Sequence, residues 1–175
     1  SSYQNDPASA KVLADTLIYM IDGIIAAHPD KFARGDSPEM IENNFEKGLI
    51  SLPMGMENGA PLITLDDIRY YYSKGIRYVT LTHGKDNHIC DSSYDTTATW
   101  GGLSPYGLKA IAEMNNIGMI IDVSHISDKT FYQVMEHSRA PVLATHSSCR
   151  YFTPGWERNM SDEMIIELGK HGGVI

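Results

Sequence analysis

The sequence predicts an α/β fold with parallel strands, and two observations carry this prediction. Apolar runs of strand length alternate with segments of helical period along most of the 175 residues. The strand-length runs are almost continuously apolar, which is typical of strands buried on both faces of a sheet. Alternation at this spacing implies right-handed crossovers, so a doubly wound sheet and a (β/α) barrel both fit.

The first part of the chain predicts two helices and a strand. Between residues 10 and 27, apolar side chains recur at three- and four-residue steps, which predicts a helix. Ser37, with a proline directly after it, predicts the start of a second helix that ends at Gly48. Residues 49–56 then predict one buried strand that terminates at Glu57.

Three further units repeat this helix-then-strand order, and each strand runs into a histidine. The helices open on side-chain caps, and Ser161 caps a last helix that Gly172 closes before a final strand. The caps of the three repeated units are Thr64, Ser104 and Ser127, and the strands are residues 76–82 before His83, 119–124 before His125 and 140–145 before His146.

Four successive predicted strands therefore end in a residue that can bind a divalent metal: Glu57, His83, His125 and His146. The carboxyl ends of parallel strands gather at one face of a sheet or barrel, so these side chains are expected to converge. Alternation along the strands predicts that Val79 and Leu81 share an interior face with His83. Imidazole and carboxylate donors suit zinc, with manganese, iron or cobalt as substitutes. The alternative for each histidine alone is a hydrogen-bonded core residue.

Composition limits the possible partners. The chain has 14 Lys and Arg against 22 Asp and Glu, a net charge of −8, which repels nucleic-acid phosphates and anionic lipid. No apolar run approaches the length of a membrane span, and the two cysteines, Cys90 and Cys149, can form one bridge at most.

The long polar segment from 84 to 103 follows a strand and is expected to be functional.

Five segments together resemble the membrane dipeptidase family of zinc peptidases, and the resemblance runs from about residue 47 to the C-terminus. In this sequence the segments read GMENG (55–59), IRYVTLTH (76–83), GLSPYG (102–107), MNNIGMIIDVSH (114–125) and APVLATHSS (140–148), followed by Arg158-Asn159. The resemblance implies a (β/α) TIM-type barrel that hydrolyses dipeptides with two zinc ions. Residues 1–175 are then expected to form one partial barrel, about strands three to seven of eight, that continues beyond both ends.

The resemblance also implies a role for each matching residue. Glu57 bridges both zinc ions, and His125 and His146 complete the second zinc site. His83 contacts the substrate and stabilises the tetrahedral intermediate. Arg158 contacts the substrate, through a guanidinium fork that suits its carboxylate. A small peptide is the implied partner, the family often forms homodimers, and any export signal or anchor would lie outside this chain.

The sequence departs from the family in ways that leave alternatives open. No His-x-Asp for the first zinc precedes Glu57, and the family's catalytic aspartate would lie beyond Ile175. The chain is therefore expected to be part of a dipeptidase, with a catalytically incomplete fragment, a metal-binding pseudoenzyme or a hydrolase of another amide or ester as alternatives. Asp122 lies one residue off the expected His125 face, so we expect it to cap or bond a neighbouring helix. Its alternative role is to orient an imidazole.

Overall fold

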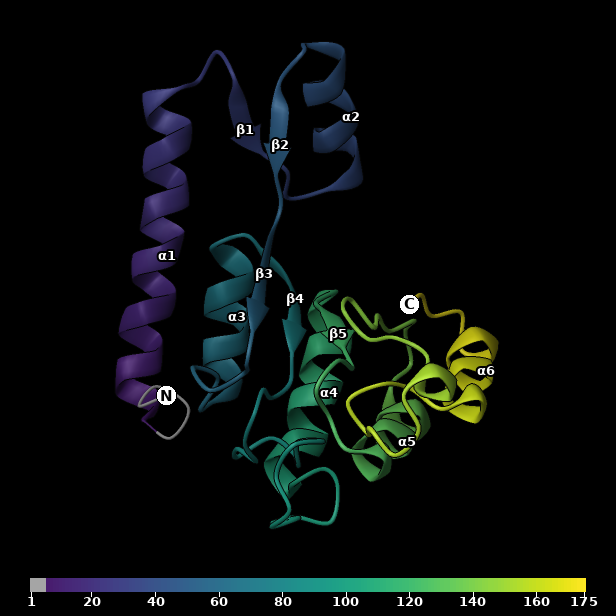
Figure 1. Cartoon of the computed structure of the whole chain (residues 1–175). Coiled ribbons are helices and arrows are strands. Elements are labelled where there is room, and N and C mark those ends of the chain that lie inside the picture. Colours follow the sequence, from purple (N-terminus) through teal and green to yellow (C-terminus); the bar gives the residue numbers. More distant parts are fainter. Residues whose placement is uncertain (1–5) are drawn as a thin grey trace.

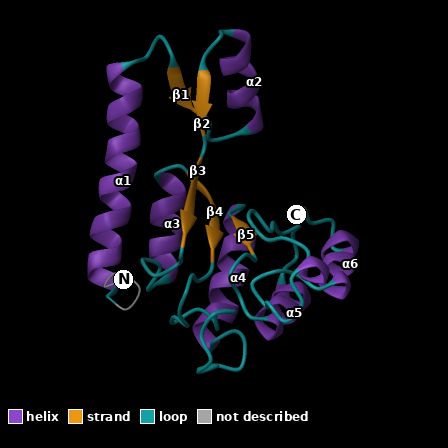
Figure 2. Cartoon of the chain, in the orientation of Figure 1, coloured by secondary structure: helices purple, strands orange, loops and turns teal. Residues whose placement is uncertain are grey.

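The computed structural model describes residues 6–175, which contain two parallel sheets flanked by helices (Figures 1 and 2). The smaller sheet pairs β1 (Phe32–Arg34) with β2 (Ile50–Leu52). The larger sheet has the order β3 (Met54–Glu57), β4 (Ile76–Thr80), β5 (Ile120–Asp122), and both of its ladders are parallel. The predicted α/β fold with parallel strands is confirmed.

Backbone hydrogen bonds extend the larger sheet beyond β5. Leu143 forms a parallel bridge with Asp122 and a second one with Val174. The amide of Leu143 donates to the Ile121 carbonyl at 2.9 Å, and the amide of Ala144 donates to the Val174 carbonyl at 2.8 Å. The strand predicted at 140–145 is thus present as isolated bridges that keep the expected direction and order.

After the first helix, the helices begin where the sequence predicts them, because a capping side chain precedes each of them. The first helix begins at Pro7, before the predicted start at residue 10, and the Asp6 side chain caps it. The helices are α1 (Pro7–Ala27), α2 (Pro38–Glu46), α3 (Leu65–Ser73), α4 (Pro105–Ile117), α5 (Asp128–His137) and α6 (Asp162–Lys170), with a short 3₁₀ helix at Arg150–Phe152. Thr64 and Asp67 form a reciprocal capping box at the start of α3. Ser37, Ser104, Ser127 and Ser161 each accept a hydrogen bond from a backbone amide of the first helical turn.

The single buried strand predicted at 49–56 is wrong, because Pro53 divides this segment. Proline has no amide hydrogen to donate to a ladder, and the chain changes partners there. Residues before it form β2, which pairs with the unpredicted strand β1, and residues after it form β3, which pairs with β4. Ile50 at the start of β2 is exposed.

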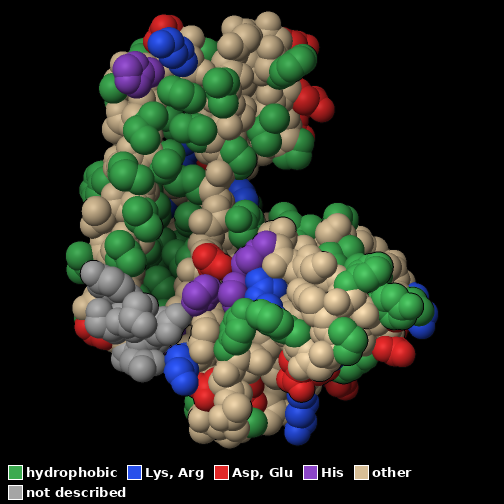
Figure 3. Space-filling view, in the orientation of Figure 1, with side chains coloured by type: hydrophobic (Ala, Val, Ile, Leu, Met, Phe, Trp, Pro, Cys, Tyr) green, Lys and Arg blue, Asp and Glu red, His purple; other side chains and the backbone are tan. Residues whose placement is uncertain are grey.

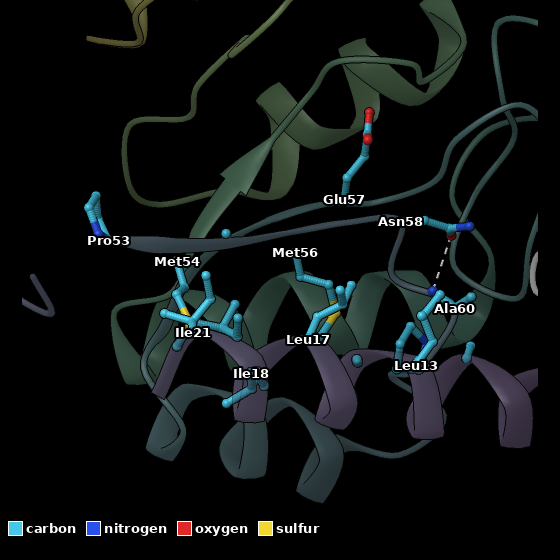
Figure 4. Close-up of a pocket in the computed structure, with 15 residues that line it drawn as sticks. Leu13, Leu17, Ile18, Ile21, Pro53, Met54, Met56, Glu57, Asn58 and Ala60 are labelled. Carbon is cyan, nitrogen blue, oxygen red and sulfur yellow. Dashed lines mark hydrogen bonds between the residues drawn. The ribbon is translucent and has the colours of Figure 1, made fainter. Parts of the chain in front are cut away.

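One face of the larger sheet packs against the helices. The register aligns Met56 with Val79 and Val79 with Ile121, and all three side chains are buried in the apolar core. An apolar groove lies between α1 and β3, and in Figure 4 Met56 points across it toward Leu17 of α1. Glu57 points away from α1, toward the opposite face of the sheet (Figure 4).

The opposite face of the sheet carries Glu57 and a close cross-strand pair. Gly55 pairs with Tyr78, and a Cβ at Gly55 would lie 2.0 Å from the tyrosine ring. Only glycine therefore leaves room for this ring on the face that leads to Glu57. Cys90 and Cys149 are both free, and no helix of the described residues is long and apolar enough to cross a bilayer.

Candidate metal centre

The sheet brings the predicted metal-binding residues to one edge. Glu57 is the last residue of β3. The three histidines follow a shared pattern, in which each lies three residues beyond the last paired residue of its strand. These pairs are Thr80 and His83, Asp122 and His125, and Leu143 and His146.

Because the chain has left each strand before the histidine, alternation along the strand does not give the direction of the ring. His125 adopts a left-handed backbone conformation with φ of 70°, which is uncommon for a residue other than glycine. Val79 lies in the row that faces the helices, whereas the histidines lie on the Glu57 side. The prediction that Val79 and Leu81 share an interior face with His83 is therefore wrong.

The ligand atoms converge on the Glu57 carboxylate. Glu57 Oε1 lies 2.9 Å from His146 Nε2, 3.1 Å from His125 Nε2 and 3.8 Å from His83 Nε2. The Nε2 atoms of His125 and His146 are 2.9 Å apart. Figure 3 shows histidine side chains gathered next to a carboxylate and a basic side chain. Carboxylate and imidazole donors at these separations can hold a divalent cation such as zinc.

Burial keeps the central imidazole in the form that binds metals. The His125 side chain is only 7% exposed. Burial, the Arg158 guanidinium and the neighbouring rings of His83 and His146 lower the pKa of His125 to about 4, against the opposing effect of Glu57. The ring is therefore neutral near pH 7, and its Nδ1 has no hydrogen-bond partner among residues 6–175.

Arg158 lies beside these ligands, although it is far from β3 in the sequence. Its guanidinium donates to the backbone oxygen of His146 at 2.8 Å and to Ser147 Oγ at 3.0 Å. Burial lowers the pKa of Arg158, but a guanidinium remains charged at neutral pH. The structure thus places a fixed positive charge next to the candidate metal ligands.

The long segment after β4 forms hydrogen bonds to the backbone of two candidate ligands. Ser92 donates its hydroxyl hydrogen toward the backbone oxygen of His83 at 2.5 Å, and the amide of Ser93 donates to the backbone oxygen of His125 at 2.8 Å. The exposed ring of Tyr94 has its centroid 6.1 Å from that of His125. This segment therefore ties two of the candidate ligands together through their backbone.

Asp122 lies beside the candidate site, and its contacts differ from those that the sequence predicts. Its carboxylate accepts hydrogen bonds from Thr80 Oγ1 at 2.5 Å, Thr145 Oγ1 at 2.6 Å, the Ser124 amide at 3.0 Å and the Thr145 amide at 3.1 Å. Burial works to raise the pKa of Asp122, but these hydrogen bonds outweigh it and lower the pKa. The expected bond to a neighbouring helix is not among these contacts.

The register between strands explains the position of Asp122. Glu57 pairs with Thr80, and Thr80 pairs with Asp122, so the three side chains lie in one row across the sheet. Thr80 and Asp122 each lie three residues before a histidine, at the last position of their strands. This repeated spacing in the sequence is the signal that could have revealed that both side chains lie beside Glu57.

The fold and the site together define a class of proteins, the parallel α/β domains that gather metal-binding side chains at the carboxyl ends of their strands. Comparison with known proteins gives the particular family. The family described as membrane dipeptidase (peptidase family M19) matches residues 3–175. The chain belongs to this family, as the sequence motifs predict.

Individual relatives agree with this assignment. An uncharacterized dipeptidase of Schizosaccharomyces pombe is 39% identical over 73% of this chain and 31% of its own length. The dipeptidase tcpJ of Claviceps purpurea is 33% identical over 90% of this chain and 37% of its own length. The crystal structure of the probable dipeptidase PvdM from Pseudomonas aeruginosa superposes with a TM-score of 0.91 at 30% identity, over 96% of this chain and 44% of that one. The chain thus spans about a third of the length of these two curated relatives.

Proposed function

We propose that this chain provides part of the active site of a zinc-dependent dipeptidase. One observation carries the proposal: Glu57 Oε1 lies 2.9 Å and 3.1 Å from Nε2 atoms of two histidines that follow different strands. Membership of the membrane dipeptidase family supports the same conclusion. The fold that goes with this proposal is a partial (β/α) TIM-type barrel, in which the larger sheet forms an arc of the wall.

The donor set fits zinc. Glu57, His125 and His146 would hold the metal, with His125 neutral at physiological pH because its pKa is lowered to about 4. A bound zinc ion supplies Lewis-acid chemistry, because it lowers the pKa of water and polarises a peptide carbonyl. The complete site would hold two zinc ions, with Glu57 as a ligand of both.

Two further residues bind the substrate in this proposal. Arg158 presents its guanidinium beside the ligands and binds the free carboxylate of a dipeptide. His83, with Nε2 3.8 Å from Glu57 Oε1, donates a hydrogen bond to the substrate carbonyl oxygen as it becomes negative. Hydrogen bonds of this kind are commonly worth about 3–4 kcal/mol of transition-state stabilisation.

A homodimer of the full-length protein, which light scattering can test, also remains a prediction.

The experiment compares metal content and dipeptide hydrolysis in the full-length protein and in two histidine-to-alanine variants. His125→Ala removes a proposed ligand, whereas His137→Ala removes an exposed histidine at the end of α5. We expect His125→Ala to lose bound zinc and at least about 100-fold in kcat/KM, because loss of an outer-shell partner alone typically costs 10- to 100-fold.

The two variants make the result specific. His137→Ala is expected to retain the zinc content and activity of the wild-type protein. If His125→Ala also hydrolyses dipeptides at the wild-type rate with wild-type zinc content, the proposed role of this site is wrong. If the wild-type protein binds zinc but cleaves other amides or esters in place of dipeptides, the site stands and the proposed substrate is wrong.

A further inference from the structure

A chain of hydrogen bonds leads from the sheet to one of the proposed metal ligands. His146 Nδ1 lies 2.7 Å from Thr145 Oγ1. The same hydroxyl lies 2.6 Å from Asp122 Oδ2. Asp122 is fully buried at the end of β5, and Thr145 belongs to the segment that follows the bridge at Leu143. The contacts therefore connect a buried carboxylate to an imidazole through a single hydroxyl.

The direction of the hydrogen atoms follows from the donors present. The Asp122 carboxylate accepts from four donors, two hydroxyls and two amides, and a carboxylate has no hydrogen of its own to give. Thr145 has one hydroxyl hydrogen, and it is directed to Asp122. Thr145 Oγ1 then has only lone pairs to offer His146, so the imidazole must donate its Nδ1–H.

The consequence is a defined tautomer of His146. With the hydrogen on Nδ1, Nε2 of the neutral ring carries a lone pair. Nε2 is the atom that lies 2.9 Å from Glu57 Oε1 and 2.9 Å from His125 Nε2. We infer that Asp122 and Thr145 are positioning residues, which hold His146 as its Nδ1–H tautomer with Nε2 directed at a divalent cation. This inference rests on the proposed metal site.

The backbone reinforces the same orientation. The amide of His146 donates to Ser124 Oγ at 3.1 Å, and the amide of Ser124 donates to Asp122 Oδ1 at 3.0 Å. Both the ring and the backbone of His146 are therefore tied to Asp122. His125, in contrast, has a buried Nδ1 without a hydrogen-bond partner among the described residues, so its orientation depends on packing and its left-handed backbone.

The sequence offers a matched pair of threonines to test this inference. Thr145 and Thr80 both donate to Asp122 Oδ2. Of these two hydroxyls, the one on Thr145 also contacts the ring of His146. Valine has the shape of threonine without the hydroxyl. Thr145→Val thus removes the link to His146, and Thr145→Ser keeps it. Thr80→Val removes a comparable hydrogen bond to the same carboxylate oxygen without touching His146.

Two readouts are taken on the full-length protein without substrate. The first is zinc affinity, measured by competition with a chromogenic chelator. We expect Thr145→Val to bind zinc about 10- to 100-fold more weakly, the usual cost of losing an outer-shell partner, and Thr145→Ser and Thr80→Val to stay within about threefold of wild type. The second is the ¹⁵N NMR signature of the His146 ring in metal-free protein. It should report the Nδ1–H tautomer in the wild type and in Thr145→Ser, and lose this preference in Thr145→Val.

Three outcomes would overturn the inference. A wild-type His146 ring that carries its hydrogen on Nε2 would do so even if no variant folds. Equal zinc affinity in Thr145→Val and wild type would do so as well. Equal weakening in Thr80→Val and Thr145→Val would assign the effect to the stability of the sheet. Since no readout uses hydrolysis, a full-length protein that lacks dipeptidase activity would count against the proposed function and leave this test intact.

Discussion

His125 should make the stability of the metal-free protein depend on pH in a window between about 4 and 6.5. In the folded protein its pKa is lowered to about 4, mainly by burial and to a lesser extent by Arg158, His83 and His146. In the unfolded chain a histidine has a pKa of about 6.5. Within this window the unfolded chain binds more protons than the folded one, so stability falls as the pH falls.

The size of the effect follows from the two pKa values. Each tenfold difference in proton affinity corresponds to about 1.4 kcal/mol, so the full effect is about 3 kcal/mol. At pH 4.5, where the folded ring is still mostly neutral, about 2–3 kcal/mol of the free energy of unfolding should be lost relative to pH 7.5. Asp122 adds a separate loss of stability at lower pH, because its pKa is lowered in the folded protein. This loss begins below about 3.9, the pKa of an aspartate in the unfolded chain.

The assay is urea unfolding of the chelator-treated full-length protein at pH 7.5 and 4.5. His125→Gln removes the ring that titrates, and His137→Gln replaces an exposed histidine on α5. We expect wild type and His137→Gln to lose about 2–3 kcal/mol more than His125→Gln between the two pH values. Equal losses in all three proteins would show that burial of His125 does not perturb its protonation as described.

Two further predictions concern packing and loop geometry. Gly55→Ala should destabilise the protein by about 1–3 kcal/mol in urea unfolding, because the new Cβ would lie 2.0 Å from the Tyr78 ring. Gly169→Ala on α6, which meets no atom within 4 Å, is the control and should not destabilise; equal effects would refute the packing argument. Arg150→Lys breaks a pair of 2.6 Å hydrogen bonds to Asp128. The substitution should raise KM several-fold with little change in kcat, because the segment that Arg150 anchors also carries Arg158, the residue proposed to bind the substrate. A fall in kcat at constant KM would contradict this role of the segment.

Local chemistry explains why the helices were predictable and some strands were not. Caps such as Ser104 and Thr64 act over three residues, so the sequence alone reveals them. The strand β1 was missed because its three residues lie among polar residues, whereas the equally short β5 lies in an apolar run that marks it. The division of residues 49–56 at Pro53 depends on two different partner strands, which only the assembled sheet defines.

The candidate site was predictable to the extent that it depends on strand ends. Glu57, His125 and His146 meet because parallel strands end at the same edge, and this required only their order in the sequence. The orientation of the rings was not predictable, since His125 turns through a left-handed backbone conformation after β5 has ended. Extending the alternation past that end placed Asp122 on the wrong side of the sheet.

The most direct test of the metal site is to locate zinc by anomalous diffraction in crystals of the full-length protein. We predict an anomalous peak within about 2.0–2.2 Å of a Glu57 carboxylate oxygen and of the Nε2 atoms of His125 and His146. A zinc ion bound elsewhere, with these three side chains outside coordination distance of any metal, would contradict the account.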